Sequence, residues 1–234
     1  MDESIIKMNR FLAAHSFYPL ILSSFMAFAF FVFRIFYSET TNYSNLLWNL
    51  ILAWLPYIFS LLAVYIFTTN RKHWLFIGLL GILWLIFFPN APYMVTDFYH
   101  LEPRNPVPLW FDISLIAIFA FTGFFLAIAS LRSIHIIIEG YLGKIIGWVF
   151  ALLALNLASL GVYLGRFGRY NSWDILIEPK SVIREIAYNL LNPLDNLGFV
   201  GFTLMFSSIL LVSYLMFMTG PHPGINTEKA KSST

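Results

Sequence analysis

The residues that could most readily do chemistry lie in two polar segments of an otherwise apolar chain. The first reads PNAPYMVTDFYHL from Pro89 to Leu101 and places Asp97 three positions before His100. On a helix these two side chains share one turn. A carboxylate beside an imidazole can orient it as a general base. The same pair could hold a divalent metal ion with a third ligand, or could be a structural ion pair.

These alternatives stay open at the level of the sequence. Asp97 and His100 are the catalytic candidates, and no metal site is assigned. The third metal ligand would have to come from Glu102, Asp112 or Asp174.

The second polar segment reads GRFGRYNSWD from Gly165 to Asp174. Its residues Arg166, Arg169 and Asn171 could bind a phosphate or carboxylate, because a guanidinium offers two parallel donors to such an anion. Alternatively, the arginines pair with Asp97, Asp112 or Asp174 and join the two segments. We expect an ion pair between the segments, since a buried charge needs a partner. The full candidate set for ligand binding is Asn90, Tyr93, Asp97, His100, Asp112, Arg166, Arg169, Asn171 and Asp174.

The elements that position these residues are predicted from hydrophobic periodicity. Pro92 suits the first position of a short helix that reaches Leu101, and we expect this segment to be amphipathic at the interface or re-entrant. Gly161 and Gly165 allow a neighbouring helix to approach closely. The segment from Ser181 to Leu191 places Val182, Ile183, Ile186 and Leu190 on one face, which is typical of a helix lying on a membrane.

Polar residues also recur at helical spacing before the second segment. They are Asn156, Ser159, Tyr163, Arg166 and Tyr170. We expect this line to face the bundle interior or a pocket, because polar groups facing lipid are costly.

Composition defines the class of protein. Of the 234 residues, 59% are hydrophobic and 11% are charged, and the mean hydropathy is +0.75. About 25% charged residues would be usual in a soluble domain, so a soluble protein is excluded. The formal net charge of +2, with no basic cluster, gives no indication of nucleic-acid binding. The absence of cysteine excludes disulfides and thiolate metal sites, and no cofactor motif is present.

Six segments are long and apolar enough to cross a bilayer, which takes about 20 residues. They are approximately Phe17–Tyr37, Leu46–Thr68, His73–Pro89, Ile113–Leu131, Ile145–Gly165 and Leu197–Met218. The sequence therefore predicts an all-α integral membrane bundle forming one domain over residues 1–219. It also predicts a polar, disordered tail over 220–234.

The distribution of lysine and arginine predicts the orientation. Eight of these residues fall on the side of the N-terminus and six on the other side, where acids match most of them. By the positive-inside rule both termini are expected in the cytoplasm, with the two polar segments outside.

The motifs PNAPYMVTDFYHL, PLWFD (Pro108–Asp112) and GRFGRYNSWD resemble the domain of unknown function 1361 family. The resemblance runs from the second span to the sixth and implies a multi-pass plasma-membrane protein of bacterial type. It brings no activity, substrate or cofactor. Three hypotheses remain. The first is binding of an anionic lipid, a lipid-linked sugar or an envelope protein at the outer polar cluster. The second is a membrane enzyme acting on a phosphate-bearing lipid or lipid-linked sugar, and the third is a small transporter.

Overall fold

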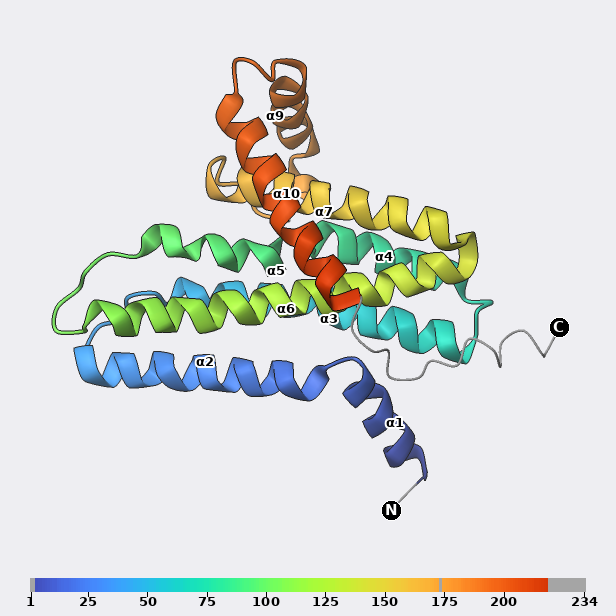
Figure 1. Ribbon diagram of the computed structural model, residues 1–234, viewed down its shortest axis with the longest axis horizontal. Helices are drawn as coiled ribbons and strands as arrows, with labels where there is room; N and C mark the ends of the chain where they lie inside the picture. The colour runs from blue at the N-terminus through green and yellow to red at the C-terminus, as the bar shows by residue number, and fades with distance from the viewer. Residues whose placement is uncertain (1–2, 173, 219–234) are drawn as a thin grey trace.

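The computed structural model describes residues 3–172 and 174–218, which form helices joined by turns (Figure 1). The predicted tail over 220–234 lies outside the described residues. In chain order the elements are α1 (Glu3–Ala14), α2 (Phe17–Ser38), α3 (Asn45–Thr69), α4 (Trp74–Phe87), α5 (Asn90–Tyr93), the 3₁₀ helix η1 (Met94–His100), α6 (Leu109–Leu142), α7 (Lys144–Arg166), α8 (Asp174–Ile177), α9 (Pro179–Leu191) and α10 (Leu197–Met218).

Within the described residues, six helical runs are long and apolar enough to cross a membrane. They are α2, α3, the run Trp74–His100, α6, α7 and α10, and each overlaps a predicted span. Helices are the expected solution, because lipid leaves no water to satisfy backbone N–H and C=O groups. The predicted all-α bundle with six membrane helices is confirmed.

Helix α6 is the central element of the bundle. It has 34 residues, which corresponds to a length of about 51 Å. It contacts α2, α3, α5, η1, α7 and α10. Figure 1 shows α6 in the middle, with α2 along one side and α10 crossing it obliquely. Most of the polar contacts that join separate helices therefore involve α6 or its immediate neighbours.

The segment expected to be amphipathic or re-entrant continues the third span. Residues Trp74–His100 form one helical run, in which α5 and η1 extend α4 along the bundle (Figure 1). Gly123 on α6 makes this packing possible, since a Cβ there would lie 2.6 Å from the carbonyl oxygen of Ala91. The chain does not turn back because α5 and η1 fill the space beside α6 and α3.

Helix α7 approaches the third span through its glycines, as predicted. A Cβ on Gly161 would lie 2.7 Å from Cγ of Pro89, and one on Gly165 would lie 3.2 Å from the ring of Tyr93. The two glycines therefore let α7 lie directly against the Pro89–Tyr93 turn.

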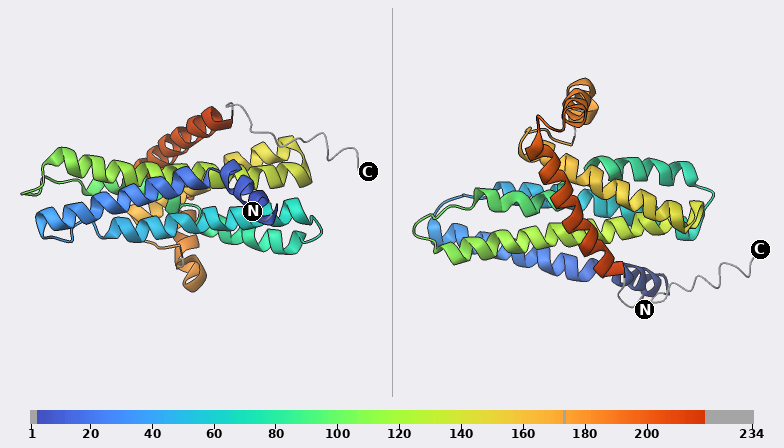
Figure 2. Two further views of the ribbon diagram at one scale, coloured as in Figure 1. Left: turned by 90° about the horizontal axis from the view of Figure 1, so that it is seen from below. Right: turned by 45° about the horizontal axis from the view of Figure 1, so that its top comes forward.

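Helix α9 confirms the helix predicted after Pro179, and it projects away from the bundle (Figures 1 and 2). Its apolar residues do not all share one environment. Val182 is buried, whereas Ile183 is 59% exposed, and the side chain of Leu190 lies outside the described part. That α9 lies on a membrane surface stays a prediction.

Candidate functional site

Arg166, the last residue of α7, is held by a cluster of side chains on the third span. Its Nη2 donates to Oδ1 of Asp97 at 2.6 Å, its Nε donates to Oγ1 of Thr96 at 2.9 Å, and its Nη1 lies 2.5 Å from Nε2 of His100. The guanidinium carbon also lies 4.4 Å above the ring of Tyr93. The predicted ion pair between the two polar segments is therefore confirmed. We call these five residues the Arg166 cluster.

The local backbone explains how one arginine reaches so many partners. In a 3₁₀ helix, side chains at i and i+3 eclipse each other, so Asp97 and His100 on η1 present their polar groups along one edge. The arginine in turn occupies the C-terminal end of α7, where a cation is favoured by the helix dipole. The helix predicted from Pro92 to Leu101 is a 3₁₀ helix over most of its length. The observed η1 brings Asp97 and His100 together by its tighter winding.

The ion pair at the centre of the cluster is buried, whereas His100 at its edge is exposed. The side chains of Arg166 and Asp97 are 5% and 1% exposed. The other carboxylate oxygen of Asp97 accepts a hydrogen bond from Nδ2 of Asn49 on α3, at 3.0 Å. All three guanidinium nitrogens and both carboxylate oxygens therefore have partners. The cluster has the properties of a structural lock between α3, η1 and α7.

The contacts of Arg166 argue against a catalytic or metal-binding role for Asp97 and His100. The imidazole of His100 and the carboxylate of Asp97 both face Arg166, so the cation, rather than a substrate, occupies the position between them. No group of three or more His, Cys, Asp or Glu side chains gathers in the described part of the chain. The third ligand that a metal ion would need does not join the pair.

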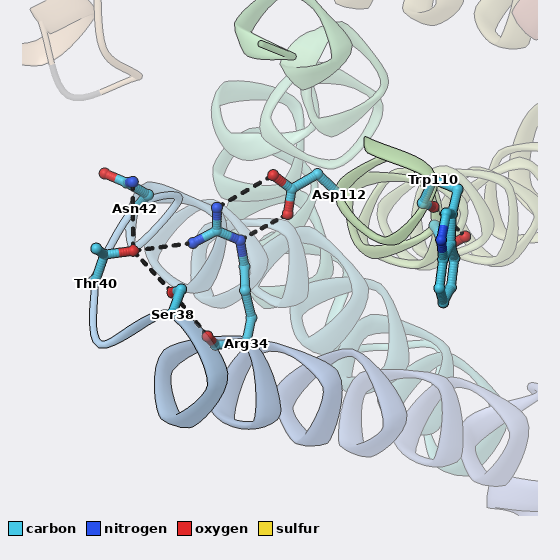
Figure 3. A network of polar contacts seen from close by, with 7 residues as sticks. Arg34, Ser38, Thr40, Asn42, Trp110 and Asp112 are labelled. Atoms are coloured by element: carbon cyan, nitrogen blue, oxygen red, sulfur yellow. Dashed lines mark hydrogen bonds and ion pairs between the residues drawn. The ribbon is translucent and has the colours of Figure 1, made fainter. Parts of the chain in front are cut away.

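A second buried ion pair connects α2 to α6 (Figure 3). Nε and Nη2 of Arg34 donate to the two oxygens of Asp112 at 2.7 and 3.1 Å, and the side chains are 1% and 0% exposed. From the sequence, Asp112 is expected to pair with Arg166 or Arg169 or to be a third metal ligand, and Arg34 has no predicted role; the structure instead pairs these two residues. The signal that could have found this pair is the position of Arg34 within an apolar span, where an ionisable residue normally has a partner.

The aromatic ring of Tyr43 supports the same pair. The guanidinium carbons of Arg34 and Arg104 each lie 4.8 Å from the centre of this ring. Arg34 also donates to Thr40, at 3.4 Å. The connection between α2 and α3 is therefore fixed to the start of α6.

The polar line predicted on α7 does not form one face. Asn156 is exposed, and its side-chain amide donates a hydrogen bond to the carbonyl of Leu152. Ser159 is buried, and its hydroxyl donates to the carbonyl of Leu155. Tyr163 packs against Phe199 and Phe202 of α10. The expectation that this line faces the bundle interior or a pocket is wrong for Asn156, which is exposed. Ser159 is buried, as expected, and Tyr163 is turned toward α10.

A cavity of about 510 Å³ lies beside the Arg166 cluster, between α3, the third span, α7 and α9. Its walls are mainly apolar and include Leu52, Ile86 and Leu160, with Val182 and Ile186 contributed by α9. We call it the α3–α7 cavity. Its polar lining consists of Asn49, Asn90, Tyr93, Arg169, Tyr170, Asn171 and Ser172.

Two polar groups of this cavity are unused. Arg169 makes no hydrogen bond or ion pair with any described residue, in contrast to Arg166. Oδ1 of Asn90 accepts from Ser172 at 3.1 Å, but its buried Nδ2 has no acceptor in the described part of the chain. The cavity therefore contains a cation and an amide donor that are not occupied by the protein itself.

The backbone of Arg169 has a conformation that is uncommon for a residue other than glycine. Its φ is +59°, in the left-handed region where a non-glycine residue is strained. Asp174, the remaining candidate, accepts from the backbone N–H of Asn171 at 2.6 Å. It thus fixes the turn that follows Arg169.

The candidate residues therefore separate into four groups. Asp97, His100, Arg166 and the ring of Tyr93 belong to the Arg166 cluster, while Asp112 pairs with Arg34. Asn90, Tyr93, Arg169 and Asn171 line the α3–α7 cavity. Asp174 supports the cavity turn without lining it.

The fold and these contacts define a multi-pass helical membrane protein with two buried ion pairs and a lateral cavity. The model of a protein family described as "Protein of unknown function (DUF1361)" matches residues 48–213. The chain therefore belongs to the DUF1361 family. No curated protein and no solved structure matches it.

Proposed function

We propose that this protein binds an amphiphile with an anionic head group, of the class of phosphate-bearing lipids or lipid-linked sugars, in the α3–α7 cavity. One observation carries the proposal. The mainly apolar cavity holds, in its polar lining, an arginine with no acidic partner among the described residues. The apolar walls suit the hydrocarbon part, and Arg169 suits the charge.

The chemistry of the polar lining supports an anion. A guanidinium binds phosphate through parallel N–H donors, and such charge-assisted hydrogen bonds are stronger than neutral ones. The free Nδ2 of Asn90 offers a further donor beside Ser172. An anion at this position would satisfy groups that the described protein leaves without acceptors.

Binding is preferred over catalysis because of the state of the candidate catalytic residues. Neither Asp97 nor His100 lines the cavity, and Asp97 is held by Arg166 in a buried ion pair, so neither is placed to exchange a proton with a ligand bound there. We further propose that the protein is a single domain in the plasma membrane with both termini in the cytoplasm, so that Arg169 serves the outer leaflet. The orientation rests on the charge bias of the sequence.

Native mass spectrometry of the purified full-length protein in neutral detergent tests the proposal. Dioleoyl phosphatidic acid, a polyprenyl phosphate and dioleoyl phosphatidylcholine are offered in equimolar amounts. We expect one of the two anionic probes to be preferred, which identifies the lipid class. Arg169→Gln should reduce that preference about tenfold, because hydrogen bonds to charged groups contribute about 1.5–3 kcal/mol. Arg184→Gln, which changes an exposed arginine outside the cavity, should leave it unchanged.

A second pair of variants tests the cavity rather than the charge. Leu160→Trp places a larger side chain on the cavity wall, whereas Leu153→Trp makes the same change at an exposed position of α7 that does not line the cavity. We expect only the first to reduce binding of both anionic probes. Equal binding by wild type, Arg169→Gln and Leu160→Trp, with thermal stability retained, would show that the cavity is not the site.

A further inference from the structure

A second cavity lies toward the opposite end of the bundle. It has a volume of about 350 Å³ and is bounded by the α1–α2 junction, α6 and α10. Leu20, Phe125, Ile128 and Phe217 contribute apolar wall, and Arg132 of α6 is the one lysine or arginine among the described residues that line it. We call it the α2–α6 cavity. Helices α6 and α7 run antiparallel, so a residue near the end of α6 is far from the turn that carries Arg169.

Arg132 is half-buried and has no acidic partner in the part of the chain that the structure describes. No carboxylate among the described residues lies within ion-pair distance of it, and it makes no hydrogen bond with them. The other titratable group lining the cavity is His15, which bonds to the carbonyl of Phe11 at 2.8 Å. Burial lowers the pKa of His15, and the charge of Arg132 lowers it further. Nothing in the described part of the cavity therefore compensates the arginine.

The position of Arg132 along α6 suits a lipid head group. Asp112 and Arg132 are 20 residues apart on this one helix, a distance of about 30 Å. That is about the thickness of the hydrocarbon core. With the Arg34–Asp112 pair at one face of the membrane, Arg132 reaches the other face. The amphipathic helix α1 leaves the bundle beside the same cavity and carries Lys7 and Arg10, which would attract anionic lipid.

We propose that the α2–α6 cavity binds an anionic glycerophospholipid from the leaflet that faces α1. Its phosphate lies against the guanidinium of Arg132, and one acyl chain lies along the apolar wall beside Leu20 and Ile128. This site is distinct from the α3–α7 cavity and draws its lipid from the opposite leaflet. Either site can exist without the other.

Lipid binding to single and double variants tests the proposal. The full-length protein is titrated with dioleoyl phosphatidylglycerol and, separately, with dioleoyl phosphatidylcholine, and adducts are counted by native mass spectrometry. Arg132→Gln should weaken one phosphatidylglycerol adduct about tenfold, and Arg132→Lys should weaken it less. Arg71→Gln is the control, because Arg71 is an exposed arginine that lies over Phe67 and outside the cavity.

The location of the bound lipid is measured with single cysteines, since the natural chain has none. Ala14 lines the cavity, and its exposed neighbour Ala13 does not. Phosphatidylglycerol should slow maleimide labelling of Ala14→Cys at least threefold and leave Ala13→Cys unchanged. The slowing should disappear when Arg132→Gln is added.

The outcomes separate this proposal from the function proposed above. Loss of an adduct in Arg132→Gln but not in Arg169→Gln supports the α2–α6 site alone. The reverse result overturns it and leaves the first proposal standing. Equal protection of Ala14→Cys by phosphatidylcholine and phosphatidylglycerol would overturn the role of Arg132, because binding of a lipid with no net charge does not require a cation.

Discussion

Arg166 and Arg169 are three residues apart, but only the guanidinium of Arg166 has hydrogen-bond partners among the described residues. Arg166 contacts Asp97, Thr96 and His100 through its guanidinium, whereas Arg169 has no hydrogen-bond or ion-pair partner among the described residues and lines a cavity. The difference arises because α7 ends at Arg166 and the chain then turns through a left-handed residue at Arg169. One arginine therefore serves the fold, and the other remains available to a ligand.

We expect Asp97→Asn to reduce the free energy of unfolding by about 3–5 kcal/mol, because it leaves the buried charge of Arg166 without its counter-ion. Chemical denaturation in detergent measures this loss. The control is Glu102→Gln, since the Glu102 side chain in its ion pair with Arg104 is 72% exposed and exposed pairs contribute about 0–1 kcal/mol. Equal effects of the two substitutions would contradict the assignment of Asp97 to a structural lock.

The Arg34–Asp112 pair should show strong coupling in a double-mutant cycle. Arg34→Met and Asp112→Leu each leave one buried charge unpaired, at a cost of about 3–5 kcal/mol. The double variant removes both charges and should be more stable than either single variant. Additive losses in the same denaturation assay would show that the two residues do not interact.

Gly161→Ala should destabilise the protein by about 1–3 kcal/mol, as overpacking does, because the new Cβ would lie 2.7 Å from Cγ of Pro89. Gly201→Ala on α10 is the matched control, since no atom lies within 4 Å of the corresponding position. It should be neutral or stabilising, because alanine is the better helix former. The two melting temperatures should therefore move in opposite directions, or only the first should fall.

Stability should depend on pH through His15. Its pKa is lowered in the folded protein, first by burial, so the unfolded chain binds more protons in the range just below its ordinary pKa of about 6.5. Stability should therefore fall as the pH decreases through 6.5 and level off below the folded pKa. His15→Gln should reduce this slope between about pH 7.5 and 5.5. If the slope of stability against pH is the same in His15→Gln as in the wild type, the pH dependence arises from another group.

The orientation can be measured on whole cells with an impermeant thiol reagent, because the natural chain contains no cysteine. Asn105 lies in the turn between η1 and α6, and Lys72 lies in the turn between α3 and α4, at opposite ends of the bundle. We expect Asn105→Cys to react from outside and Lys72→Cys only after permeabilisation. Labelling of Asn105→Cys from the cytoplasm alone would reverse the proposed orientation.

Several features follow from the sequence because they depend on local pattern. The six membrane helices arise from apolar runs, and the approach of α7 to Pro89 arises from the spacing of Gly161 and Gly165. The ion pair between the two polar segments was also predictable, because a buried arginine needs an acid.

Other features depend on how the helices cross, which the sequence pattern does not specify. Arg34 lies near the end of an apolar run and its acidic partner is 78 residues away on another helix, so no local pattern pairs the two residues. The α3–α7 cavity depends on how α3, the third span, α7 and α9 are placed around it. Asn156 has the spacing of an inward-facing residue, but it is exposed and bonds to the carbonyl four residues earlier, so spacing alone gave the wrong environment for this residue.

The Arg34–Asp112 pair also imposes an order on biogenesis. The two residues are 78 positions apart, and ribosomes add about 5–20 residues per second. The acid is therefore synthesised about 4–16 s after the arginine, in a helix that enters the membrane three spans later. During that interval α2 contains a cation that is costly within the bilayer. The first membrane helix must therefore remain near the head groups, or beside the insertion machinery, until α6 is inserted and Asp112 can pair with Arg34.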